Sequence, residues 1–86
     1  MSTYRVELTR SAVKSLKRVD AHHRDRLRGV IALLSEDPRP PGARALHGRP
    51  GFRVRVGDYR VIYTIDDGRL VVVVVGLGHR RDVYSL

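Results

Sequence analysis

The sequence predicts an α+β fold of order β-αα-βββ, in which a mostly antiparallel four-stranded sheet carries a helical pair on one face. The first supporting observation is the segment FRVRVGDYRVIYTID at residues 52–66, which alternates apolar and polar residues with the period of a half-buried strand. The second is the segment at residues 27–34, where apolar residues occupy the i, i+3, i+4 and i+7 positions of an amphipathic helix. A chain of 86 residues has room for one small domain, which we expect to span residues 1–86.

The N-terminal third is expected to form a strand and two helices. Residues 4–8 alternate apolar and charged side chains, as a half-buried strand does. Thr9 or Ser11 can cap a helix that continues to about Val19, because their hydroxyl groups can accept a hydrogen bond from the first helical turn. Asp20 can cap the second helix in the same way, and an Asp-Pro pair marks its end.

Three strands are expected in the C-terminal half, after an ordered surface loop at residues 38–51 that is rich in proline, glycine and arginine. These strands cover about residues 52–56, 59–66 and 69–76. The pair Asp67-Gly68 is a type I′ turn signal, and that turn would place Tyr63 opposite Val72. The last strand is apolar on both faces, which is typical of a central strand.

Arginines meet on one face of the first predicted hairpin. If Gly57-Asp58 is a two-residue type II′ turn, with glycine where φ must be positive, Arg55 lies directly opposite Arg60. Arg53 shares that face, because residues i and i+2 of a strand point the same way. Like charges at opposite positions destabilise a sheet, so the fold alone does not need this pair. The arrangement indicates a function that uses concentrated positive charge.

An apolar strip is expected beside these arginines on the same sheet face. It is formed by Ile62, Val71, Val73 and Val75. A cationic patch next to an apolar strip is an unusual surface to leave in water, so we expect a partner segment to cover the strip.

The composition narrows the class of protein and of partner. Seventeen lysines and arginines against nine acidic residues give a net charge of +8, which predicts an anionic partner, either nucleic acid or an acidic protein. The chain has no cysteine, which excludes disulfides and thiolate metal sites. The longest apolar run is too short to span a bilayer, so we expect a soluble cytoplasmic protein with no membrane partner.

The C-terminal segment GLGHRRDVYSL adds residues suited to phosphodiester cleavage by an RNA 2′-hydroxyl. That reaction needs a base for the hydroxyl, positive charge for the phosphorane, and a proton or cation for the departing 5′-oxygen. Tyr84 is the first candidate base, provided that nearby guanidinium groups lower its pKa from about 10. His79 is the second candidate for acid–base chemistry. The candidate sources of positive charge are Arg53, Arg55, Arg60 and Arg80, and Arg81 is a further candidate contact to RNA.

Each of these residues also has an ordinary structural interpretation. A tyrosine near a C-terminus often packs with its hydroxyl in water, and arginines on a strand face are usually solvated. His79, taken alone, is interpreted as a polar loop residue. No two histidine or acidic residues show a convincing metal-ligand spacing, so we predict neither a metal nor a cofactor.

The element order and two segments resemble the RelE/ParE superfamily of toxins from bacterial and archaeal toxin–antitoxin pairs. The segments are RVRVGDYRVIYTIDDG at residues 53–68 and GHRRDVY at residues 78–84. The resemblance covers nearly the whole chain and implies a single RelE-like toxin domain at residues 1–86. It further implies one of two activities. RelE-like members cleave mRNA in the ribosomal A site without metal, leaving 2′,3′-cyclic phosphate ends, whereas ParE-like members poison DNA gyrase.

The resemblance also assigns roles to individual residues. Arg60 falls on the RelE arginine that follows the G-Y or D-Y pair, Arg80 on the arginine after the last strand, and Tyr84 on the proposed general base. Arg53 and Arg55 fall where well-studied RelE proteins carry lysines. This departure bears on the chemistry, because arginine binds phosphate well but is a poor proton donor or acceptor at neutral pH.

The sequence therefore favours the toxin of a type II toxin–antitoxin system, acting as a ribosome-dependent, metal-independent mRNA endoribonuclease. Its expected partners are a cognate antitoxin, the ribosome with its mRNA, and operator DNA only through the antitoxin complex. The alternatives are a ParE-like gyrase inhibitor and a noncatalytic antitoxin-binding module, because the same fold can carry different sites.

Overall fold

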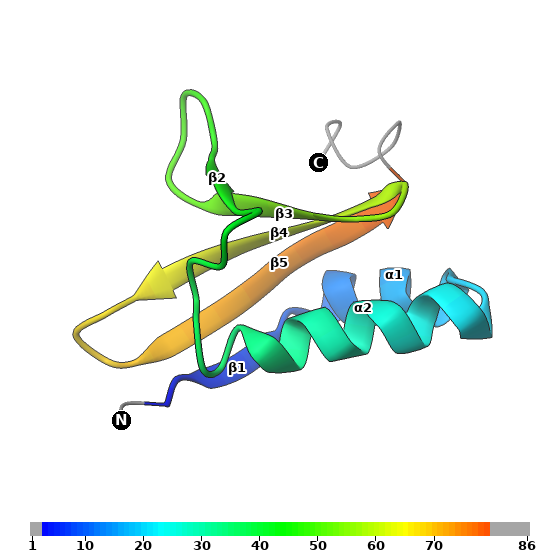
Figure 1. The fold of residues 1–86 in the computed structure, drawn as a ribbon, viewed down its shortest axis with the longest axis horizontal. Helices are drawn as coiled ribbons and strands as arrows, with labels where there is room; N and C mark the ends of the chain where they lie inside the picture. Colours follow the sequence, from blue (N-terminus) through cyan, green and yellow to red (C-terminus); the bar gives the residue numbers. More distant parts are fainter. Residues whose placement is uncertain (1–2, 80–86) are drawn as a thin grey trace.

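The computed structural model describes residues 3–79, and there the predicted α+β class is confirmed, with two helices on one face of a mixed sheet (Figure 1). The elements are β1 (Arg5–Leu8), α1 (Arg10–Arg18), α2 (Ala21–Leu33), β2 (Arg44–Ala45), β3 (Phe52–Val56), β4 (Tyr59–Asp66) and β5 (Val71–His79). The sheet order is β1-β5-β4-β3-β2, in which only the β1–β5 pair is parallel. The sheet thus has five strands instead of the predicted four. Neither helix in the described part of the chain is long and apolar enough to cross a membrane.

Both predicted helix caps are confirmed, and the alternative cap Ser11 is not used. The Thr9 hydroxyl accepts a hydrogen bond from the Ala12 backbone N–H at 3.1 Å, and α1 begins at the next residue after Thr9. The Asp20 carboxylate accepts from the His23 N–H at 3.3 Å and starts α2. Each side chain satisfies one of the backbone donors that a helix N-terminus leaves free.

The segment predicted as a surface loop contains the additional strand. Arg44 and Ala45 pair with Arg53 and Phe52 of β3 in antiparallel register. The connection between the strands is closed by a hydrogen bond from the Leu46 N–H to the Gly51 carbonyl at 3.0 Å. It rises from the sheet on the side away from the helices (Figure 1). A strand of two residues has no alternation to detect, so periodicity could not predict it.

The predicted tight turn between β4 and β5 is wrong. Asp66 pairs with Val71, so residues 67–70 form a wider loop, and Tyr63 lies opposite Val74 instead of Val72. The Asp66 carboxylate accepts the Arg69 N–H at 3.0 Å and fixes this wider turn. Positive φ (55°) occurs at Leu70, at the end of the loop, whereas a type I′ turn needs positive φ at both central residues. The hydrogen bond between Arg69 and Asp66 thus stabilises a wider loop than the two-residue turn that an Asp-Gly pair favours.

A bulge in β5 decides which residues face the helices. Tyr63 pairs with Val74 but Ile62 pairs with Gly76, so Val75 is an extra residue in β5. The Thr9 hydroxyl donates to the Val75 carbonyl at 3.2 Å and so ties the bulge to the start of α1. An extra residue exchanges the two faces of a strand beyond it. Leu77 therefore enters the core with 2% of its surface exposed.

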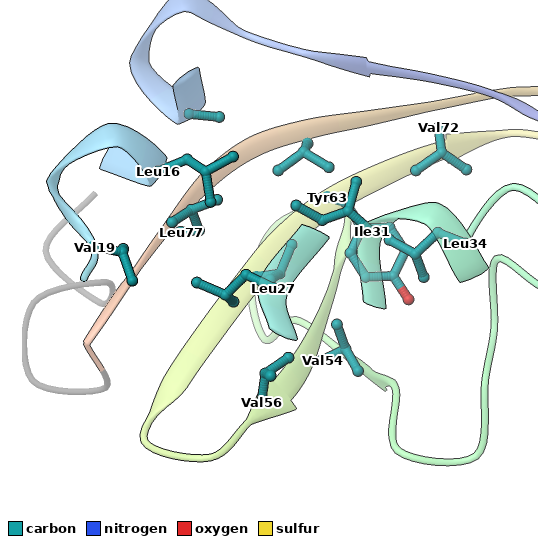
Figure 2. Packing of buried hydrophobic residues seen from close by; sticks show 13 residues of the cluster. Leu16, Val19, Leu27, Ile31, Leu34, Val54, Val56, Tyr63, Val72 and Leu77 are labelled. Carbon is teal, nitrogen blue, oxygen red and sulfur yellow. The ribbon is translucent and has the colours of Figure 1, made fainter. Parts of the chain in front are cut away.

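The core lies between the helices and one face of the sheet (Figure 2). Leu27 and Leu34 from the α2 side meet Val54 and Tyr63 from the sheet, and all four are buried. The Tyr63 hydroxyl still has a partner, because it donates to the Pro38 carbonyl at 2.8 Å. Burial raises the pKa of Tyr63 to about 12, so this donor keeps its proton over the physiological range. Tyr63 thereby anchors the segment that leads into β2.

A polar clasp, defined as Tyr4, Arg39, Phe52 and Asp67, ties the same segment to the sheet. The Arg39 guanidinium donates two hydrogen bonds to the Asp67 carboxylate, at 2.9 and 3.2 Å. The Tyr4 hydroxyl donates to the same carboxylate at 2.6 Å. The Arg39 guanidinium also lies 5.4 Å from the centre of the Phe52 ring, within cation–π range. The clasp joins the start of β1, the β4–β5 loop and the segment before β2.

We expect the clasp to stabilise the fold at neutral pH and to lose that contribution to the free energy of unfolding in acid. The Arg39 guanidinium and the Tyr4 hydroxyl lower the pKa of Asp67 to about 2, below its ordinary value of about 3.9. This contribution is present above pH 4 and is lost as the pH falls through about 2, because the unfolded chain takes up the proton first. The measurement is thermal unfolding between pH 6 and pH 2. At pH 6 the Asp67→Asn variant should have a lower Tm than the wild type, and its Tm should fall less steeply than that of the wild type as the pH is lowered.

Arg39→Gln is the complementary variant, since it removes the same ion pair from the other side. Its acid dependence should match that of Asp67→Asn, and high salt should narrow the gap to the wild type, because the pair is exposed to solvent. Wild-type acid dependence in both variants would show that the clasp does not contribute to stability.

Candidate functional site

The β3–β4 hairpin brings its arginines together in the predicted register. Arg55 pairs with Arg60, and Arg53 pairs with Ile62 two residues further from the turn. Gly57 has the positive φ of 61° that the tight turn requires. Val54 and Val61 alternate with these residues and are buried in the core, so the arginines lie on the sheet face turned away from the helices.

The additional strand β2 brings a fourth arginine to this face. Arg44 is the Cα partner of Arg53, and directly opposite residues of an antiparallel pair share a face. We call the set Arg44, Arg53, Arg55 and Arg60 the arginine face. Arg44 was not predicted as a member, because residues 38–51 were expected to form a loop. The sequence feature that could have indicated this strand is the pair of glycines at positions 48 and 51. Both have positive φ and allow the chain to reverse direction after Arg44.

The guanidinium groups of the arginine face differ in exposure. Arg60 is half-buried, and its Nε has less than 1 Å² of accessible surface. Arg55 is exposed, and its Nε donates to the carbonyl of Gly57, the first residue of the turn, at 3.0 Å. Arg44 is exposed, and its Nη1 donates to the Ala43 and Pro41 carbonyls at 3.0 and 3.3 Å. A partly desolvated cation interacts more strongly with an anion than an exposed one, so Arg60 is the strongest candidate for contact with a reacting phosphate.

His79 lies on the other side of the sheet. It pairs with Tyr59, which shares the face of the buried Val56 and Val61. The His79 and Tyr59 rings meet edge to face with centroids 5.9 Å apart, and the His23 ring from α2 lies 5.3 Å from that of Tyr59. The structure therefore groups His79 with the helix-side aromatic residues and not with the arginine face. The bulge in β5 explains this placement, because it exchanges the two faces of the strand before residue 79.

The other predicted site residues lie outside the described part of the chain. These are Arg80, Arg81 and Tyr84. The strand that leads to these residues does lie beside the strand that carries Arg60: β5 pairs with β4, and Gly78 is the partner of Arg60. Within residues 3–79, no three histidine, aspartate or glutamate side chains are grouped as ligands for a metal ion.

The expected apolar strip is only partly open to solvent. Ile62 has 2% of its surface exposed and Val75 has 38%, while Val71 and Val73 are half-buried. The strip is thus not one continuous apolar surface, and Val75 at the bulge is its exposed member. Alternation alone assigned these residues to a face correctly but could not give their exposure.

Comparison with known proteins places this arrangement in a family. Residues 6–84 match the family described as the ParE toxin of the type II toxin–antitoxin system parDE. The chain is 29% identical over 87 residues to the mRNA interferase toxin RelE of Escherichia coli K12, covering 95% of this chain and 90% of the relative.

Solved structures with the same fold come from two further organisms. The RelBE2 toxin–antitoxin complex of Mycobacterium tuberculosis matches with a TM-score of 0.83 and 28% identity, over 95% of this chain and 97% of that one. The RelE–RelB complex of the archaeon Pyrococcus horikoshii matches with a TM-score of 0.79 and 29% identity, over 94% and 99% of the two chains. Because the family match extends over nearly the whole sequence, the chain belongs to the ParE toxin family of type II toxin–antitoxin systems, within the RelE/ParE superfamily.

Proposed function

We propose that this toxin is a RelE-type, ribosome-dependent mRNA endoribonuclease. The observation that carries the proposal is the cross-strand pair of Arg55 and Arg60, extended on the same face by Arg53 and Arg44. Directly opposed like charges cost stability in the free protein. The cost is offset when a phosphate chain lies between the guanidinium groups, because arginine binds phosphate bidentately and keeps its charge. A relative named as an mRNA interferase supports the same substrate class.

The proposed reaction is an attack of the RNA 2′-hydroxyl on the adjacent phosphorus. The 2′-oxygen forms a bond to phosphorus, the bond from phosphorus to the 5′-oxygen breaks, and the products are a 2′,3′-cyclic phosphate and a 5′-hydroxyl. The 2′-hydroxyl proton passes to a base, and the departing 5′-oxygen takes a proton from water. Negative charge builds up on the phosphorane oxygens and on the departing 5′-oxygen, so cationic groups placed beside these atoms lower the barrier most.

Roles follow from the positions of the residues. Arg60 stabilises the phosphorane, and Arg53 and Arg55 hold the RNA backbone. We assign Arg80 to the same charge stabilisation, Arg81 to the RNA backbone and Tyr84 to the base, in line with the superfamily pattern. His79 is the weaker candidate base, because its described contacts are with Tyr59 on the helix side. Since arginine is a poor proton donor, the arginines act through charge alone.

The proposed partners follow from this activity. The substrate is mRNA bound to the ribosome in the cytoplasm, and a cognate antitoxin neutralises the toxin by covering its cationic surface. Related toxins were crystallised with their antitoxins, as in the complexes from Mycobacterium tuberculosis and Pyrococcus horikoshii. Contact with operator DNA is proposed only through the antitoxin complex.

Arg44 gives a test of the extent of the arginine face. Arg44→Ala should raise the toxin concentration needed for half-maximal cleavage about tenfold and leave the maximal rate unchanged, because an exposed arginine lost from the periphery removes one contact to the RNA backbone. The measurement is a single-turnover titration of toxin against ribosomes carrying mRNA. Arg69→Ala is the matched control, since Arg69 is exposed in the β4–β5 loop, at the opposite end of β4 from the hairpin turn. Equal behaviour of the two variants would exclude Arg44 from the RNA-binding surface.

The test of the proposed function is primer extension on a translated mRNA in a reconstituted translation system, beside the same mRNA without ribosomes. Cuts within ribosome-bound codons that are absent from the naked RNA are the expected result. A gyrase supercoiling assay on the same protein tests the alternative, which the ParE name of the matching family favours. Intact mRNA with arrested gyrase would establish a gyrase inhibitor, and inactivity in both assays would leave a noncatalytic antitoxin-binding module.

A further inference from the structure

Gly78 is a glycine that the fold itself does not require. It lies within β5, and its φ is outside the left-handed range that favours glycine. A Cβ atom added at this position would meet no heavy atom within 4 Å. Gly51 shows the opposite case: its φ is 126°, and an added Cβ would lie 3.0 Å from the Leu46 side chain and 3.1 Å from the Tyr63 carbonyl. Packing thus explains Gly51 but not Gly78.

Glycine at such a position carries a cost. A glycine inside a strand loses more conformational freedom on folding than alanine does, and it offers no side chain to pack. The first part of β5 consists of valines, the residue type that strands favour. A glycine inside a strand often marks a bulge, a tight bend or a site where a ligand or another backbone approaches closely. The bulge of β5 lies at Val75, three residues before Gly78, and so does not itself account for this glycine.

The neighbour of Gly78 shows which surface this open space adjoins. Gly78 is the Cα partner of Arg60, so a side chain at position 78 would lie on the arginine face, about 5 Å from the Arg60 Cβ. Arg60 has Arg55 on its other side. Arg60 therefore has a like-charged residue opposite it on β3 and a residue without a side chain opposite it on β5. The bulge at Val75 produces this arrangement. Beyond it, Leu77 lies on the helix side of the sheet, and Gly76 and Gly78 lie on the side of the arginine face.

We propose that Gly78 keeps open the space beside Arg60 in which the scissile phosphate and its ribose lie, and that it is a positioning residue of the cleavage reaction. This inference rests on the proposed endoribonuclease function. A guanidinium holds a phosphate oxygen at about 2.7–2.9 Å, so the phosphate must come close to the sheet surface to reach a half-buried Arg60. The methyl group of an alanine at position 78 would fill part of the space through which the phosphate reaches Arg60, and the isopropyl group of a valine would fill more of it.

The test is a size series at this position, Gly78→Ala and Gly78→Val, read by single-turnover cleavage of ribosome-bound mRNA and by thermal unfolding. We expect a rate loss of about tenfold for alanine and about 100-fold or more for valine, because a displacement of about 1 Å can cost 100-fold in rate. The Tm should stay unchanged or rise by a few degrees, because the backbone and the surrounding space accept a side chain.

Gly29→Ala is the matched control. Gly29 lies exposed in α2, and an added Cβ there also meets nothing within 4 Å. This variant should raise the Tm by up to about 8 °C, because alanine favours a helix, and should cleave as the wild type does.

Two results would overturn the role of Gly78 while leaving the endoribonuclease function intact. One is wild-type cleavage by Gly78→Val, and the other is a fall in Tm for Gly78→Ala that accounts for its lost activity. Inactivity of the wild type on ribosome-bound mRNA would instead overturn the proposed function, and the role of Gly78 with it.

Discussion

Replacing Arg60 by alanine is expected to slow cleavage of ribosome-bound mRNA by about 100-fold to 1,000-fold. Loss of one preorganised charge aimed at a transition-state oxyanion has a cost of this size. Arg60 is the half-buried residue of the Arg55–Arg60 pair, so its charge is less screened by water than that of Arg55. The loss should appear in the maximal single-turnover rate, because the phosphorane charge exists only in the transition state.

The same variant should stay folded, because relief of the repulsion from Arg55 opposes the packing that is lost when a half-buried side chain is truncated. Arg60 lies opposite Arg55, and removing one of two directly opposed like charges relieves repulsion. Thermal unfolding of Arg60→Ala therefore serves as the internal control for the rate. Arg60→Lys should lie between the wild type and alanine, since lysine keeps the charge but loses the planar fork that binds phosphate bidentately. A loss confined to ribosome affinity, with the maximal rate intact, would reassign Arg60 to docking.

Tyr84→Phe is expected to lose most cleavage, by about 100-fold to 10,000-fold, while keeping the fold. The variant removes only the hydroxyl group, and a general base or acid contributes rate factors of this size. The readout is the single-turnover rate on ribosome-bound mRNA, with thermal unfolding as the measure of folding.

His79→Gln is the comparison variant for Tyr84→Phe. The His79 ring contacts Tyr59 on the helix side of the sheet, so we expect this variant to cleave at a rate close to that of the wild type. The reverse pattern, with Tyr84→Phe active and His79→Gln inactive, would remove Tyr84 from the base role and assign that role to His79.

The parts of the fold that the sequence predicted well are those set by local chemistry. Thr9 and Asp20 have side chains that satisfy the first donors of a helix, and both begin helices as expected. Gly57 takes the positive φ that its turn requires, and this turn sets the pairing of Arg55 with Arg60. The pairing of Arg55 with Arg60 could therefore be predicted from one turn and from the alternation of apolar and polar residues along the two strands.

The features that the sequence did not reveal depend on contacts between distant segments. The bulge at Val75 is tied to the Thr9 hydroxyl, 66 positions away in the sequence. Without it, simple alternation would place Gly76 with Val72 and Val74 on the helix side, and the open space beside Arg60 would not be recognised. Arg44 reaches the arginine face through a two-residue strand that has no periodic signal. Pairing of this kind is decided by tertiary structure and not by local propensity.

We propose that this toxin cleaves ribosome-bound mRNA through attack of the RNA 2′-hydroxyl on the adjacent phosphorus. The most direct measurement is single-turnover cleavage of two programmed ribosome complexes that differ by one atom. In one complex the mRNA is all-ribose, and in the other the nucleotide on the 5′ side of the mapped cut is 2′-deoxy. We predict cleavage of the all-ribose mRNA to a 2′,3′-cyclic phosphate and no cleavage at the deoxy position. Equal cleavage of both mRNAs, or an intact all-ribose mRNA, would contradict the claim.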